Sequence, residues 1–134
     1  MANEAVLKIE THIPINFTCS TLVTIEKGAI VKMTDPMTAV LSSSANQIVA
    51  GIVQSEKLAA DTTQNSVAIF RGGVFRVTVS GSVSVGDPVT TGATANYVVK
   101  ATTNDENILG IMLEDGTEGQ TKLMELRPTT MQLA

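Results

Sequence analysis

The residue types that most often carry catalysis are scarce in this sequence of 134 residues. It contains one histidine, His12, and one cysteine, Cys19. Nucleophilic catalysis needs a general base beside the nucleophile, and the spacing of these two residues does not specify such a pair. We expect His12 to be a solvated turn residue and Cys19 to be a small buried hydrophobic residue. The sequence therefore assigns no catalytic residue and predicts that the protein is not an enzyme, with a small hydrolase using His12 as its base as the enzymatic alternative.

Carboxylates gather in one region, at Asp105-Glu106 and between Glu114 and Glu118. Paired carboxylates can exchange protons or bind calcium, but the alternating ligand positions of a calcium loop are missing here. Asp115-Gly116 is an ordinary turn dipeptide, so we expect a solvated turn, with a calcium site as the alternative. The glycine pairs lack the Gly-Lys-Ser/Thr ending of a phosphate-binding loop. The sequence predicts no metal site and no cofactor.

The charge pattern argues against two classes of partner. The formal net charge is −4, and the nine basic residues are scattered rather than clustered. Nucleic-acid binding and polybasic membrane attachment both need clustered Lys or Arg, so we expect neither partner. No apolar run approaches the roughly 20 residues of a membrane span, and the N-terminus lacks the features of a signal peptide. We expect a soluble protein synthesised in the cytoplasm.

Short β-like runs alternate with turn signals along the whole chain. Aromatic residues are only 3% of the sequence, whereas Val, Thr and ten Gly dominate the runs and turns, a composition typical of short strands. Arg71-Gly72-Gly73 predicts a tight hairpin, and residues 57–61 could form one helical turn. The expected strands are residues 6–9, 13–17, 21–25, 29–33, 48–53, 67–70, 74–79, 88–90, 97–100, 108–112 and 122–126.

The chain also resembles itself. Residues 27–31 match 85–89, residues 48–53 match 108–112, and residues 67–71 match 123–127, with offsets of 58, near 59 and 56. These matches predict two similar units, 25–71 and 83–127, although chance similarity among Gly- and Val-rich strands is the alternative. Two such units packed face to face would share one core, because each alone buries little. We therefore predict an all-β fold, a small β-barrel or β-clip-like sandwich of two similar β units with an extended N-terminal arm.

Both ends of the chain extend beyond this repeat. We divide the chain into an N-terminal arm or edge strand (1–20), a β domain (21–127) and a C-terminal tail (128–134). The arm is apolar at alternate positions, and an edge strand of this kind can pair with another chain; Met in the tail adapts to irregular contacts. Packing within the chain is the alternative for both ends. The candidate protein-interface residues are Val6, Ile9, Ile13, Ile15, Phe17, Met131 and Leu133.

Four segments resemble a known family. IVAGIV (48–53), VAIFRGGVFRV (67–77), VGDPV (85–89) and ILGIM (108–112) look like the phage capsid cement, or head decoration, proteins, and the resemblance covers about residues 21–127. It implies a β-clip or barrel fold and a structural virion protein that stabilises an icosahedral capsid. The resemblance further implies binding to the major capsid protein on the outer capsid surface, after synthesis in the host cytoplasm. It favours a homotrimer and carries over no catalytic residue.

A second class of function stays open beside this one, a β-rich module of a phage tail or fibre that binds carbohydrate or protein. Carbohydrate sites usually stack sugars on aromatic rings, and one Tyr with three Phe argues against a sugar ligand. The long arm and the tail are departures from a minimal family member. They leave open the oligomeric state, the capsid position and an exchange of the arm between subunits.

Overall fold

The computed structural model describes residues 3–42, 44, 46–102 and 107–130. The described residues form eleven β-strands and no helix, which confirms the predicted all-β class. The strands are β1 (Val6–Ile9), β2 (Ile15–Thr18), β3 (Ile30–Asp35), β4 (Thr38–Leu41), β5 (Val49–Val53), β6 (Ser66–Phe70), β7 (Gly73–Val79), β8 (Pro88–Thr91), β9 (Tyr97–Lys100), β10 (Asn107–Met112) and β11 (Thr121–Thr130).

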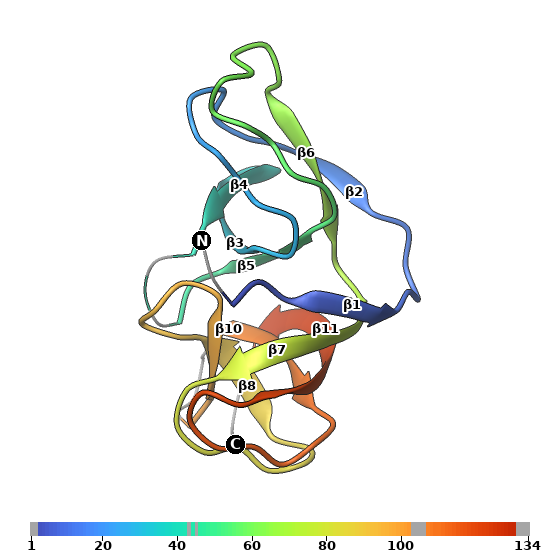
Figure 1. Cartoon of the computed structure of the whole chain (residues 1–134), viewed down its shortest axis with the longest axis vertical. Coiled ribbons are helices and arrows are strands. Elements are labelled where there is room, and N and C mark those ends of the chain that lie inside the picture. Colours follow the sequence, from blue (N-terminus) through green and yellow to red (C-terminus); the bar gives the residue numbers. More distant parts are fainter. Residues whose placement is uncertain (1–2, 43, 45, 103–106, 131–134) are drawn as a thin grey trace.

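Ten of these strands close into two barrels of five (Figure 1). The first barrel has the order β2-β4-β3-β5-β6, closed by pairing of β6 with β2. The second runs β7-β11-β10-β8-β9 and is closed by a pairing of β7 with β9. Figure 1 shows the first barrel above the second, with β1 running between them. The prediction of two similar β units is confirmed.

The two barrels have the same topology. Strands β2 to β6 correspond one by one to β7 to β11, and each barrel has one parallel pair, β2–β4 or β7–β9. The backbone bond from Gly28 N to Val53 O (2.9 Å) recurs as the bond from Gly86 N to Met112 O (2.8 Å). Gly28 and Gly86 have φ angles of 84° and 87°, which a residue with a Cβ rarely adopts. The predicted match between these glycines therefore holds in three dimensions.

A second pair of glycines lets each barrel close. A Cβ at Gly51 in β5 would overlap the carbonyl oxygen of Phe70, and a Cβ at Gly110 in β10 would overlap that of Glu125. Both oxygens belong to the neighbouring strand, so the absent side chain permits a close backbone approach. Gly51 and Gly110 also occupy matching places in the predicted repeat.

The third predicted match is one residue out of register. Ile69 pairs with Val53 in the first barrel, and Met124 pairs with Met112 in the second. Residue 69 therefore corresponds to residue 124, which is an offset of 55 rather than 56. Because side chains alternate across a strand, a slip of one residue exchanges the inner and outer faces. The strand pairings therefore determine how β6 corresponds to β11, which the sequence similarity alone placed one residue out.

Each barrel has its own interior, contrary to the expectation of one core shared by two half-units. Ten of the described residues are buried inside the first barrel, including Phe17, Val31 and Ile69. A second cluster fills the second barrel and continues into the junction, where it includes Ile30 and Ile52 of the first barrel. The five strands of each unit, which include one parallel pair, close around an interior of their own. The core of each barrel therefore does not depend on packing the two units face to face.

The junction between the barrels is both apolar and hydrogen-bonded. Phe70 and Phe75 meet edge to face with ring centroids 5.7 Å apart, a favourable aromatic geometry. Asn96, buried at the β8–β9 turn, accepts a hydrogen bond from Ile30 N (3.0 Å) and donates one to Glu4 (3.3 Å). Thr91 Oγ1 accepts from Gln47 N at 3.0 Å. These contacts fix the second barrel against the β3–β5 side of the first.

The N-terminal segment connects both barrels. Strand β1 pairs antiparallel with β7 of the second barrel, whereas β2 belongs to the first. Ala5 N donates to Gly28 O at 2.8 Å, so the segment before β1 also covers the start of β3. Residues 15–18 of the expected arm are thus a strand of the first barrel. The division into residues 1–20, 21–127 and 128–134 stays a prediction.

Some local expectations were wrong. Residues 21–25 form a loop, and strand β4 (Thr38–Leu41) was not expected. Strands β6 and β7 do not form a hairpin, because β6 pairs with β2 and β5 while β7 pairs with β1, β9 and β11. Arg71-Gly72 is instead the crossing from one barrel to the other. Residues 57–61 do not form a helical turn, because Lys57 lies in a β-bridge and residues 59–60 form a turn.

The close approach at Gly110 predicts a steric cost that can be measured. Gly110→Ala should lower the free energy of unfolding by about 3 kcal/mol, because a methyl group there displaces the β11 backbone at Glu125. Gly119→Ala is the control: no described atom lies within 4 Å of its Cβ position, and only its φ of 82° opposes the change, at about 1 kcal/mol. Urea unfolding followed by circular dichroism measures both values, and equal losses would refute the steric account.

Candidate interaction surface

The histidine and the cysteine lie in different surroundings. His12 is exposed in the β1–β2 turn, where its Nδ1 is 2.8 Å from Thr11 Oγ1 and its ring lies against Gly72. Cys19 is buried in the first core, and burial raises the pKa of its thiol, an effect that the nearby Lys57 charge opposes. No hydrogen bond joins the two among the described residues. A raised thiol pKa makes the reactive thiolate scarcer.

The acidic region holds backbone turns in place. Glu114 accepts from Leu123 N, Asp115 from Val85 N and Glu118 from Gly81 N, at 2.9, 2.8 and 2.9 Å. Each carboxylate thus serves a different backbone donor around one end of the second barrel. The residues Asp105 and Glu106 lie outside the described part of the chain.

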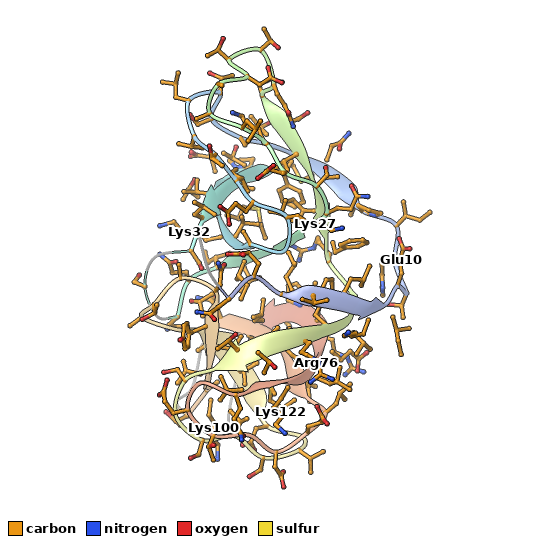
Figure 2. The ribbon with its side chains drawn as sticks, viewed as in Figure 1. Glu10, Lys27, Lys32, Arg76, Lys100 and Lys122 are labelled. Atoms are coloured by element: carbon orange, nitrogen blue, oxygen red, sulfur yellow. The ribbon has the colours of Figure 1, made fainter. Side chains whose placement is uncertain are left out.

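Within the described ranges, no three His, Cys, Asp or Glu side chains are grouped to hold a metal ion. In the same residues no helix has the length and apolar character needed to cross a membrane. Figure 2 shows the basic side chains distributed over both barrels, with Lys27 and Lys32 on the first and Arg76, Lys100 and Lys122 on the second.

The least expected polar residue is Lys57, which is 0% exposed. Its ammonium group donates to the carbonyl oxygens of Thr21 and Val23, both at 2.9 Å, and of Leu58 at 3.1 Å. Residue 57 also forms a backbone bridge with Ile25. One side chain thereby joins the two long loops at the end of the first barrel, residues 19–29 and 54–65, at the top of Figure 1.

No local pattern marked Lys57 as buried. Its neighbours Glu56 and Leu58 are exposed, and lysine is rarely buried without a partner. The repeat offers the one available signal, because the Ile25–Lys57 bridge corresponds to the Val83–Gly116 bridge. If the alignment of Gly51 with Gly110 is continued along the chain, Lys57 falls opposite Gly116, which is a bridge position.

The predicted arm residues lie at the surface with one exception. Val6, Ile9, Ile13 and Ile15 are exposed, and Ile13 reaches 87% exposure in the β1–β2 turn. Phe17 is 2% exposed and packs inside the first barrel, so its assignment to a surface is corrected. Alternation placed it on the same face as Ile13 and Ile15, but the inner face of β2 begins at Phe17. Met131 and Leu133 lie outside the described residues.

A cleft borders the arm. It has a volume of about 520 Å³ and lies between β1, the Lys27-Gly28 turn and the end of β5. Phe70 and Phe75 contribute apolar walls, and Glu4 and Glu10 contribute carboxylates. Burial raises the pKa of Glu4, and the negative charge of Glu26 raises it further. The arm therefore adjoins an apolar hollow with an acidic border.

Other exposed apolar side chains lie away from the arm. Leu22 and Leu58 occupy the loops that Lys57 joins, and Val85 occupies the matching end of the second barrel. Met37 and Ile48 are exposed on the first barrel at the β3–β4 turn and just before β5. Isolated exposed apolar residues are normal; several on one small protein make its surface a better candidate for function than any polar cluster.

No known protein family and no curated protein matches the sequence. Among solved structures, the N base of head fiber gp8.5 in bacteriophage phi29 has a similar fold, with a TM-score of 0.56. The match covers 91% of this chain and 98% of that chain, at 14% sequence identity. At this identity the likeness is one of fold. The resemblance to head decoration proteins stays a prediction.

The role of Lys57 can be tested by removing its charge while keeping its volume. Lys57→Met should lower the free energy of unfolding by about 3 kcal/mol, because four part-buried bonds from the ammonium group to loop carbonyls are lost. Lys100→Met is the matched control: Lys100 is half exposed and 3.7 Å from Asp87, and such pairs contribute at most about 1 kcal/mol. Urea unfolding measures both. A Lys57→Met protein as stable as the wild type would show that the loops do not need this bond network.

Proposed function

We propose that this chain is a structural protein of a phage virion, attached to the head. The observation that carries the proposal is the two-barrel fold, which the chain shares over 91% of its length with the base of a phage head fiber. A fold alone does not define a function. The sequence resemblance to head decoration proteins supports the same assignment independently, and a structural role requires no assembled catalytic group.

The more detailed form of the proposal is a decoration protein. In this form the chain binds the major capsid protein on the outer capsid surface, associates with itself as a homotrimer, and strengthens the capsid. Repetition over an icosahedral surface lets individually weak contacts add up. A net charge of −4 suits a solvent-facing subunit, because like charge opposes aggregation of particles.

The second candidate is the attachment base of a fibre. The fold likeness to a fiber base supports it as much as the first candidate and does not separate the two. A fibre base binds the head without needing to strengthen it, so capsid stability separates the two candidates. A sugar-binding fibre module is disfavoured by the three Phe and one Tyr, and a glycan array would reveal it.

Binding to heads tests the shared part of the proposal. Purified protein should co-sediment with expanded heads of its phage that lack it, and the decoration form further predicts that the heads then resist heat and chelator better. Binding without added resistance would favour the fibre base. Failure to bind would refute attachment to the head.

The arm is the surface that we expect to contact the capsid. Ile13→Asp should weaken co-sedimentation at least about 30-fold if this apolar side chain is an anchor, with no loss of stability because the residue is exposed. Leu22→Asp is the control, since Leu22 is also exposed but lies in the loops at the far end of the first barrel. Loss of binding in the Leu22 variant alone would move the contact to that end.

A further inference from the structure

The two barrels share a topology but differ in what covers one matching face. In the first barrel this face consists of Gly28, Ile30, Val49 and Ile52, all of which are buried. Ile30, Val49 and Ile52 belong to the same apolar cluster as the interior of the second barrel, and Ala5 covers Gly28. The second barrel and the N-terminal segment together remove this face from solvent.

The matching face of the second barrel is open among the described residues. The strand pairings equate Gly28, Ile30, Val49 and Ile52 with Gly86, Pro88, Ile108 and Ile111. These four residues, with Arg127 and Thr129, line a mainly apolar pocket of about 350 Å³. Gly86 is exposed and Pro88 and Ile111 are half-buried, whereas Ile108 is only 3% exposed, so the face is open at three of its four positions.

The covering surface is repeated as well. Asn96 at the β8–β9 turn contacts the first barrel, and its equivalent in the β3–β4 turn is Met37, because Tyr97 pairs with Thr78 as Thr38 pairs with Thr18. Both residues have positive φ, 67° and 52°. Asn107, whose N–H donates to Asn46 Oδ1 in the loop before β5 at 2.7 Å, likewise corresponds to the exposed Ile48. Whereas Asn96 is buried at the junction, Met37 is 48% exposed.

The chemistry of the two unmatched surfaces is complementary. Within the chain, Ile30 N–H donates to Asn96 Oδ1. At the equivalent positions, Pro88 has no N–H to donate and Met37 has no strong acceptor to offer. The donor and the acceptor of the contact within the chain are therefore both absent at the equivalent positions, so the two unmatched surfaces are both apolar there. Flexible Met is well suited to fill an irregular apolar pocket.

We propose that a second copy of this chain docks its β3–β4 turn, with Met37 at the centre, onto the pocket formed by Gly86, Pro88, Ile108 and Ile111. The contact reproduces between copies the junction that already joins the two barrels within a copy. It is heterologous, because the turn of one copy meets the pocket of the next, and such contacts build closed rings or filaments rather than simple twofold dimers. This contact goes beyond head binding and does not require it.

Light scattering on the eluting peak of a sizing column tests the contact. The wild-type protein should have a mass of more than two copies of 14.1 kDa. Met37→Asp and Ile111→Asp should each reduce it to one copy, since either variant loses one half of every contact. Thr129→Arg is a second pocket variant at an exposed position, in case Ile111→Asp unfolds; circular dichroism checks the fold of each.

Mixing the variants is the most specific measurement. A Met37→Asp copy keeps its pocket and an Ile111→Asp copy keeps its turn, so the mixture should form a complex of two copies and stop there. Ile13→Asp, designed to weaken head binding, should keep the wild-type mass, which separates failure of this contact from failure of the proposed function.

Two results would overturn the proposal. The first is a wild-type protein of one-copy mass at every concentration, and the second is an unchanged mass for Met37→Asp. In the first case, association after removal of residues 131–134 would identify the chain's own tail as the occupant of the pocket.

Discussion

The burial of one apolar face of the first barrel is the constraint on which the rest of the structure depends. Ile30 and Ile52 point out of their own barrel, so closing that barrel does not remove them from water. The second barrel must therefore dock against β3 and β5, which determines where the chain crosses at Arg71-Gly72. The same docking brings Asn96 to the start of β3 and leaves β1 beside β7. The arrangement of the whole molecule follows from covering this face.

Duplication preserves the backbone and lets the side chains diverge. At the far end of the first barrel an ammonium group, from Lys57, donates to loop carbonyls. At the same end of the second barrel, Asp115 and Glu118 accept from loop N–H groups instead. The requirement is the same in both barrels, because a loop that crosses a barrel end has backbone groups in need of partners. A positive side chain that donates to carbonyls and a negative side chain that accepts from N–H groups both satisfy loop backbone groups. The side chains at these positions can therefore differ between the two barrels, and comparing them does not reveal the repeat.

The sequence predicted much of this architecture and missed specific parts of it. Alternating Val and Ile placed ten of the eleven described strands to within a few residues, because the period of two is local. The glycine matches predicted two units, since close backbone approach tolerates few alternatives. Barrel closure, the separation of β6 from β7 and the burial of Phe17 were missed, because each depends on pairing between distant segments. Lys57 was missed since two of its partners, the carbonyls of Thr21 and Val23, lie more than thirty residues away, and no side-chain motif records a bond to a backbone carbonyl.

A duplicated barrel gives a simple physical route to assembly. When the second barrel covers a face of the first, two surfaces of the same chain are left over. One is the covering surface of the first barrel, and the other is the matching face of the second barrel. These two surfaces cannot meet within one chain. Natural selection can make the leftover pair polar, which yields a soluble monomer, or apolar, which yields association. Here the leftover pair is Met37 with the Pro88 face, and neither side carries the polar group that its equivalent, Asn96 or Ile30, uses. A polar group on either side would have to give up water on association without finding a partner on the other side. The absence of such groups from both sides lowers the cost of burying the two surfaces against each other.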